Sequence, residues 1–126
     1  VVLHDLGIIH EGTAPNLLLV AVPPLVWIVV ALAARVSRPF LTLLATGAFY
    51  GVLLGGVHQL LWGAAFPGGA PTLGGNLANI DPTLQAVIVR AAAALSSLLT
   101  GVVVGALTGL LAEAVRALTR AVGTDR

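Results

Sequence analysis

Two titratable residues lie inside long apolar segments, and they are the first candidates for chemistry: His58 and Arg90. Such groups are costly in a bilayer and are functional candidates by default. On a helix at 100° per residue, His58 and Trp62 fall on the same side, with Gln59 at its edge. We therefore predict a ligand-binding site formed by His58, Gln59, Trp62 and Arg90.

The heights of these side chains are compatible with one site in the outer half of a membrane. His58 is expected about 10 Å above the midplane and Arg90 about 18 Å above it, a difference that an arginine side chain can cover. The polar loop residues Asn76, Asn79 and Asp81 are expected above this site, where they could pair with Arg90. In the alternative, structural interpretation, Arg90 reaches the headgroups and His58 bonds across helices to a serine or a carbonyl.

The N-terminal segment 1–16 carries two further histidines and mixes apolar with polar residues. It is predicted to be an extracytoplasmic arm on the membrane surface, with His4, Asp5, His10 and Glu11 facing water. The same four side chains could form a weak divalent metal site, because imidazole and carboxylate donors suit such ions. Their spacing is not diagnostic, so the favoured interpretation assigns no metal.

The sequence offers little support for catalysis. It lacks a Ser-His-Asp order, an HExxH motif, a phosphate loop and a nucleotide signature. It has no cysteine, which excludes disulfides and thiolate chemistry. It also lacks a basic patch for nucleic acid. We predict that the protein is not an enzyme, and that it binds no cofactor and no nucleic acid.

The composition indicates a lipid environment. Hydrophobic residues make up 58% of 126 residues and charged residues 9%, whereas a soluble domain carries roughly 25% charged residues. The predicted fold is all-α: a small polytopic helical membrane protein with three transmembrane helices in a single domain, 1–126. The predicted spans are 17–34, 40–63 and 83–122, with an outer loop at 64–82 and a cytoplasmic extension on the third helix.

Prolines and an aspartate indicate local features of these helices. Pro23 and Pro24 lie inside the first span and are expected to kink or break it, either as a structural kink or as a hinge beside a binding site. Trp27 is then expected to pack against another helix. Asp81 and Pro82 have the arrangement of an N-cap followed by a first-turn proline, so the third helix should begin there.

Glycines at four-residue intervals mark two helix faces. Without side chains, such faces allow the close backbone approach by which helices pack in lipid. We predict glycine-zipper packing, in which one face packs within the protomer and the other meets a partner, identical or not. The residues are Gly47, Gly51 and Gly55 in the second span, and Gly101, Gly105 and Gly109 in the third.

The six basic residues are all arginines, and their distribution predicts the orientation. Five flank the turn after the first span or follow the third span, and one lies on the opposite side: Arg35, Arg38, Arg116, Arg120 and Arg126 against Arg90. The positive-inside rule then places the N-terminus outside and the C-terminus in the cytoplasm of a cell membrane. The exclusive use of arginine, with abundant alanine, glycine and valine, is typical of a GC-rich bacterial genome.

Two functions fit this pattern. Polar residues occupy the outer half of the glycine faces, whereas the inner half is mostly apolar, so an outward-facing cavity is favoured over a continuous channel. The first hypothesis is a homo-oligomeric channel- or carrier-like transport protein with that cavity. The alternative is a non-catalytic accessory or anchoring subunit of a larger membrane complex, in which the glycine faces dock a membrane-protein partner.

Overall fold

The regular elements are all helical in the part of the chain that the structure describes. The computed structural model describes residues 2–10 and 12–124, but not the side chains of His4 and Thr124. The long helices are α2 (Ala14–Ala33), α3 (Pro39–Leu60) and α5 (Pro82–Thr124). The short elements are α1 (Val2–Asp5), α4 (Trp62–Ala65) and the 3-10 turn η1 (Gly75–Leu77). The predicted all-α class is confirmed. Within the described residues, three helices are long and apolar enough to cross a membrane.

Helix α2 is continuous through its two prolines, so they do not break it, and the predicted kink stays a prediction. Each proline removes one backbone hydrogen bond, but its fixed φ is compatible with a helix, and the turns on both sides of Pro23 and Pro24 hold the segment together. Trp27 packs against Tyr50 of α3 in an edge-on arrangement with ring centroids 5.2 Å apart. That contact confirms the expected packing of Trp27 against another helix.

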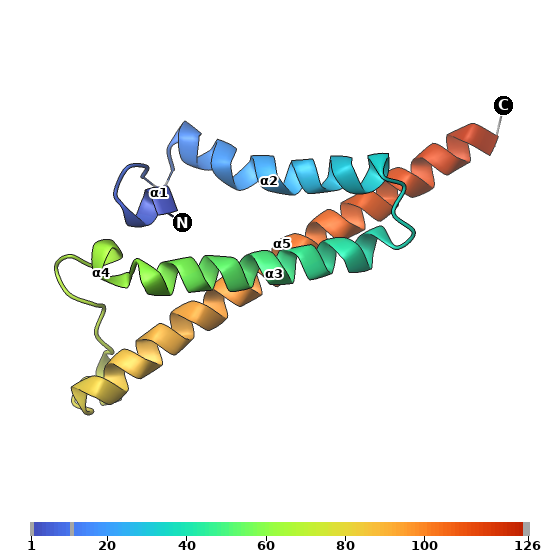
Figure 1. Cartoon of the computed structure of the whole chain (residues 1–126). Coiled ribbons are helices and arrows are strands. Elements are labelled where there is room, and N and C mark those ends of the chain that lie inside the picture. The colour runs from blue at the N-terminus through green and yellow to red at the C-terminus, as the bar shows by residue number, and fades with distance from the viewer. Residues whose placement is uncertain (1, 11, 125–126) are drawn as a thin grey trace.

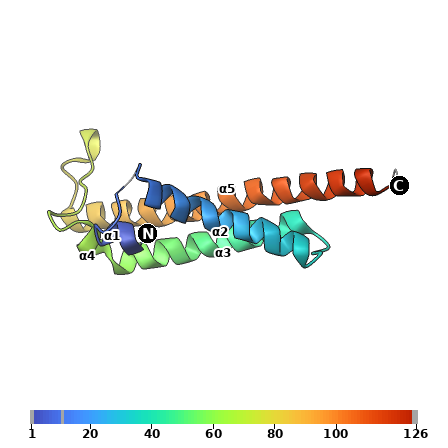
Figure 2. The ribbon, with the colours of Figure 1, turned by 90° about the horizontal axis from the view of Figure 1, so that it is seen from above.

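Helix α5 begins where the sequence indicates. The Asp81 carboxylate oxygen Oδ1 accepts hydrogen bonds from the backbone N–H groups of Thr83 and Leu84, at 2.9 and 3.1 Å. This N-cap satisfies donors that the first turn of a helix leaves unpaired. The 43 residues of α5 extend about 65 Å, and both views show this helix projecting past the α2–α3 turn (Figures 1 and 2).

Helices α3 and α5 run antiparallel and cross with their backbones in contact (Figure 1). A Cβ atom placed on Gly47 would lie 2.5 Å from the Gly105 Cα atom and would overlap the Gly101 carbonyl oxygen. One placed on Gly101 would lie 2.6 Å from the Gly51 Cα atom. At Gly55 the nearest atom would be a side-chain carbon at 3.4 Å, so the helices separate toward that end.

The predicted division of the two glycine faces is therefore wrong. Both faces are used on each other, inside one chain, and neither is left for a partner. The cause is the matching four-residue spacing, which places Gly47 and Gly51 opposite Gly101 and Gly105 of the antiparallel helix.

Helix α2 is attached to this pair near its C-terminal end. Ala31 packs there against Leu43 of α3 and Ala112 of α5, and all three side chains are buried. Toward its N-terminus, α2 runs apart from α3 (Figure 1).

Two polar side chains of α5 hold the α2–α3 turn at this end. The Arg116 nitrogen Nη1 donates to the carbonyl oxygens of Val36 and Ser37, both at 2.9 Å. The Glu113 carboxylate accepts from the Phe40 backbone N–H at 3.5 Å. A carboxylate is favourable at the N-terminus of α3, where the helix dipole is positive.

The glycine contact predicts a strong position dependence for one substitution. Gly47→Ala should destabilise the protein by at least about 2 kcal/mol, because the new methyl group meets backbone that moves only if the helices separate. Gly56→Ala is the matched control on the same helix, since a Cβ there meets nothing within 4 Å. It should stabilise the protein by roughly 0.5–1 kcal/mol through helix propensity. Unfolding titrations in detergent measure both effects, and equal stabilities of the two variants would contradict the contact.

Candidate functional site

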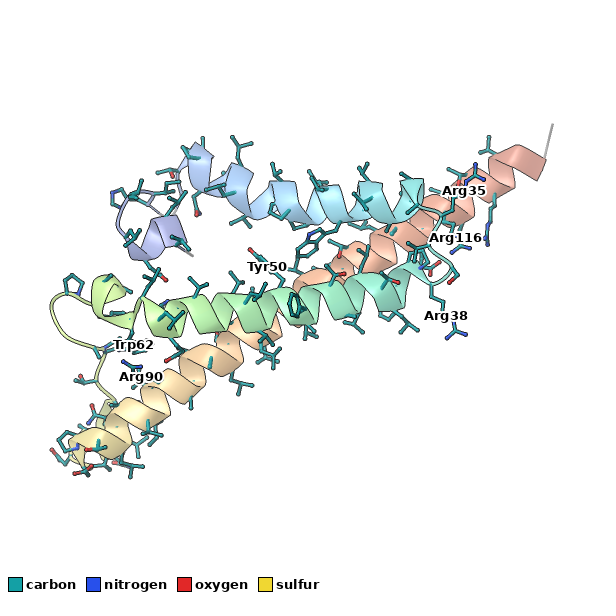
Figure 3. The ribbon with its side chains drawn as sticks, viewed as in Figure 1. Arg35, Arg38, Tyr50, Trp62, Arg90 and Arg116 are labelled. Carbon is teal, nitrogen blue, oxygen red and sulfur yellow. The ribbon has the colours of Figure 1, made fainter. Side chains whose placement is uncertain are left out.

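Polar and aromatic side chains gather at the end of the molecule where α3 passes into α4. We call this group, Asp5, His58, Gln59, Trp62 and Arg90, the polar cluster. Three elements contribute besides α3: Asp5 ends α1, Trp62 begins α4 and Arg90 lies in α5. Figure 3 shows Arg90 directed toward Trp62, between α4 and the first turns of α5.

The centre of the polar cluster is a carboxylate–imidazole pair. The His58 nitrogen Nδ1 lies 3.1 Å from Asp5 Oδ2 and 3.3 Å from Oδ1. The Asp5 side chain is 4% exposed and that of His58 is 23% exposed. A carboxylate with so little access to water depends strongly on its hydrogen-bond donors. The pair therefore ties α1 to the end of α3.

Aromatic rings surround the other faces of the imidazole. The His58 ring centroid is 5.3 Å from that of Trp62 and 6.0 Å from that of Phe66, both edge-on. The Arg90 guanidinium carbon lies 5.0 Å from the centroid of the Trp62 ring. That distance is within the range of a cation–π interaction, which contributes about 0.5–2 kcal/mol depending on exposure.

A hydrogen bond joins α3 and α5 beside this aromatic group. The Gln59 side-chain amide donates to the Arg90 backbone carbonyl at 3.1 Å. The site has room for such side chains because the helices have already separated at Gly55, one turn closer to the crossing. The crossing at Gly47 and Gly51 thus determines where large polar residues can fit between α3 and α5.

The four residues predicted from the sequence lie together in the structure, and their ligand-binding role stays a prediction. The expected pairing of Arg90 with Asp81 is wrong, because Asp81 caps α5 while Arg90 lies over Trp62. Asn76 and Asn79 are exposed in the loop. His58 bonds across elements as the structural interpretation proposed, but its partner is a carboxylate.

The N-terminal segment differs from the predicted surface arm. Asp5 was expected to face water and is buried instead, because it reaches His58. His10 is exposed, whereas the His4 side chain and Glu11 lie outside the described residues. Among the described residues, no group of three His, Cys, Asp or Glu side chains is placed to hold a metal ion.

Sequence reasoning missed Asp5 and Phe66 as members of this site. Helix α2 and most of α3 separate Asp5 from His58 in the sequence, so no periodicity relates them. The available signal was the position of Asp5 between Leu3 and Leu6, an acidic residue in a segment apolar enough to pack against the helices.

The chain has no match among protein-family models, curated proteins or solved structures. Its function is therefore inferred from the geometry of its own residues.

The Asp5–His58 pair predicts a measurable coupling energy. Removing one side chain leaves its partner in a poorly hydrated site. The free-energy costs of the two single substitutions should therefore add up to more than the cost of the double substitution. In a cycle of Asp5→Ala, His58→Ala and the double variant, we expect a coupling of at least about 1 kcal/mol in detergent unfolding. Gln59→Ala is the control and should cost less than about 1.5 kcal/mol, since it removes one hydrogen bond. Additive effects of Asp5→Ala and His58→Ala would show that the pair contributes nothing.

Proposed function

We propose that the chain is a non-catalytic accessory or anchoring subunit that docks against a larger protein within the membrane. The observation that carries this proposal is how the polar side chains are used. Among the described residues, no buried side-chain nitrogen or oxygen lacks a hydrogen-bond partner. A transport path needs polar groups that face a wet route through the membrane, whereas here Asp5, His58 and Gln59 bond within the chain.

The glycine interface supports the same function. Backbone contact between α3 and α5 closes the centre of the molecule at the crossing. Three residues after Gly105 on α5, the Thr108 hydroxyl donates to the carbonyls of Val104 and Gly105 on its own helix, at 2.9 and 3.0 Å. A hydroxyl bonded in this way is not presented to a solute.

Helix α2 provides the surface for docking. Only 6% of its apolar span is buried within the chain, the same share as in α5, and its buried contact with both α3 and α5 lies at its C-terminal end. Large apolar side chains are exposed along most of its length: Leu17, Leu18, Leu19, Val20, Val22, Leu25, Val26, Val29 and Val30. These side chains point to several sides of the helix, so a partner helix can pack against α2 without displacing any contact of the chain itself.

A second function, the homo-oligomeric carrier with an outward-facing cavity, is favoured by one observation. A cavity of about 250 Å³ opens between α1, α2 and α3. Asn16 and Tyr50 bring polar atoms to its otherwise apolar lining. With the N-terminus outside, as the arginines predict, this cavity would face the exterior.

Photocrosslinking in native membranes separates the two functions. A photoreactive amino acid replaces Val26, which is 50% exposed on α2, and in a matched control it replaces Ala31, which is 4% exposed on the same helix. The anchoring function predicts a discrete heavier adduct with a different protein from Val26 and none from Ala31. An adduct of twice the protomer mass favours the homo-oligomeric carrier instead. Absence of any protein adduct at Val26 would overturn both.

A further inference from the structure

A cavity rimmed by arginines lies at the end of the molecule opposite the polar cluster. It has a volume of about 400 Å³ and opens between the C-terminal end of α2, the α2–α3 turn and α5. Arg35, Arg116 and Arg120 contribute its basic side chains, and Ala31, Leu32, Val36, Pro39 and Val115 line much of the rest. We propose that this cavity binds the phosphodiester headgroup of an anionic phospholipid.

The backbone at Arg35 is the first support for this proposal. Arg35 has a φ of 51°, in the left-handed region, and every other positive-φ residue that the structure describes is a glycine. The position follows the C-cap of α2 in a Schellman arrangement: Arg35 N–H bonds to the Leu32 carbonyl and Val36 N–H to the Ala31 carbonyl, both at 3.1 Å. Glycine is the usual residue at such a position. A non-glycine side chain in this backbone region is uncommon, and it motivates the hypothesis that the guanidinium has a function.

The second support is the orientation of Arg116. Its Nη1 atom is held by the carbonyls of Val36 and Ser37, so the guanidinium plane is fixed at the wall of the cavity. Those bonds leave Nε and Nη2 as donors in the planar fork that matches phosphate oxygens. Arg116 is partly buried, and a preoriented donor loses less entropy when an anion binds.

The lining distinguishes a lipid from a soluble anion. Leu32, Val36 and Val115 form apolar walls directly beside the arginines, and α2 ends at Ala33, so the cavity lies where its apolar span meets water. An acyl glycerol can occupy such walls while its phosphate meets the guanidinium groups, whereas inorganic phosphate gains nothing from them. Basic pockets between membrane helices hold anionic headgroups in this way. The predicted orientation puts the cavity in the cytoplasmic leaflet, where anionic lipids are enriched.

The site does not depend on the proposed anchoring function, because its residues are separate from the polar cluster and from the exposed apolar side chains of α2 between Leu17 and Val30. The structure also provides a matched control. Arg38 lies at the same end of the molecule (Figure 3) but does not line the cavity. Arg35→Gly and Arg38→Gly thus remove the same charge from the same turn, and only the first affects the site.

Native mass spectrometry of the purified protein with phosphatidylglycerol, and with phosphatidylcholine of the same acyl chains, tests the proposal. We expect one tightly retained phosphatidylglycerol, bound about fivefold more weakly by Arg35→Gly and unchanged in Arg38→Gly. Because glycine suits the backbone at position 35, the variant should fold with a thermal stability equal to or above that of the wild type. Weakened binding can then be assigned to the lost guanidinium.

Three outcomes would overturn the proposal. Equal weakening by both substitutions would mean diffuse attraction to a basic turn. Equal retention of phosphatidylcholine would mean that the apolar walls alone hold the lipid. Displacement of phosphatidylglycerol by millimolar inorganic phosphate would assign the arginines to a soluble anion.

Discussion

Backbone contact between α3 and α5 is the constraint on which the rest of the structure depends. In lipid, apolar side chains gain nothing by leaving one apolar surrounding for another, so close packing has to provide the helix association. Gly47, Gly51, Gly101 and Gly105 allow that packing at the crossing. The two helices separate toward Gly55, whereas at the other end they stay in backbone contact up to Phe40 in the first turn of α3. The separation creates the gap that holds the polar cluster, and at the contacting end Ala31 of α2 packs against Leu43 of α3 and Ala112 of α5.

The two ends of the molecule are consequently specialised in different ways. At one end, Asp5, His58 and Gln59 bond to each other or to backbone, and this network holds the short helix α1 over the gap. At the other end, Arg116 donates to the α2–α3 turn while the neighbouring Arg35 stays exposed. In the first arrangement the polar side chains bond within the chain, which favours an anchoring function over transport. The second leaves guanidinium donors at a membrane boundary.

Local patterns in the sequence were sufficient to predict the helices but not the contacts between them. The capping geometry of Asp81 and Pro82 was predictable because it depends on adjacent residues. The glycine spacing identified two packing faces, yet a periodicity cannot show that each face meets the other. The Asp5–His58 pair joins residues with no common repeat, and its place depends on the gap where α3 and α5 separate. The double proline in α2 does not end the helix, because the turns around it outweigh two missing hydrogen bonds.

A disulfide between α3 and α5 tests the internal crossing most directly, since the chain has no native cysteine. A Cβ at Gly55 lies 3.4 Å from that of Ser97, near the separation of roughly 3.5–4.5 Å found in disulfides. Gly55→Cys combined with Ser97→Cys should therefore form a bond within a single chain on mild oxidation in membranes, whereas Gly56→Cys with Ser97→Cys should not. Formation of the Gly55–Ser97 bond between chains, or equal yields from both pairs, would contradict an internal glycine interface.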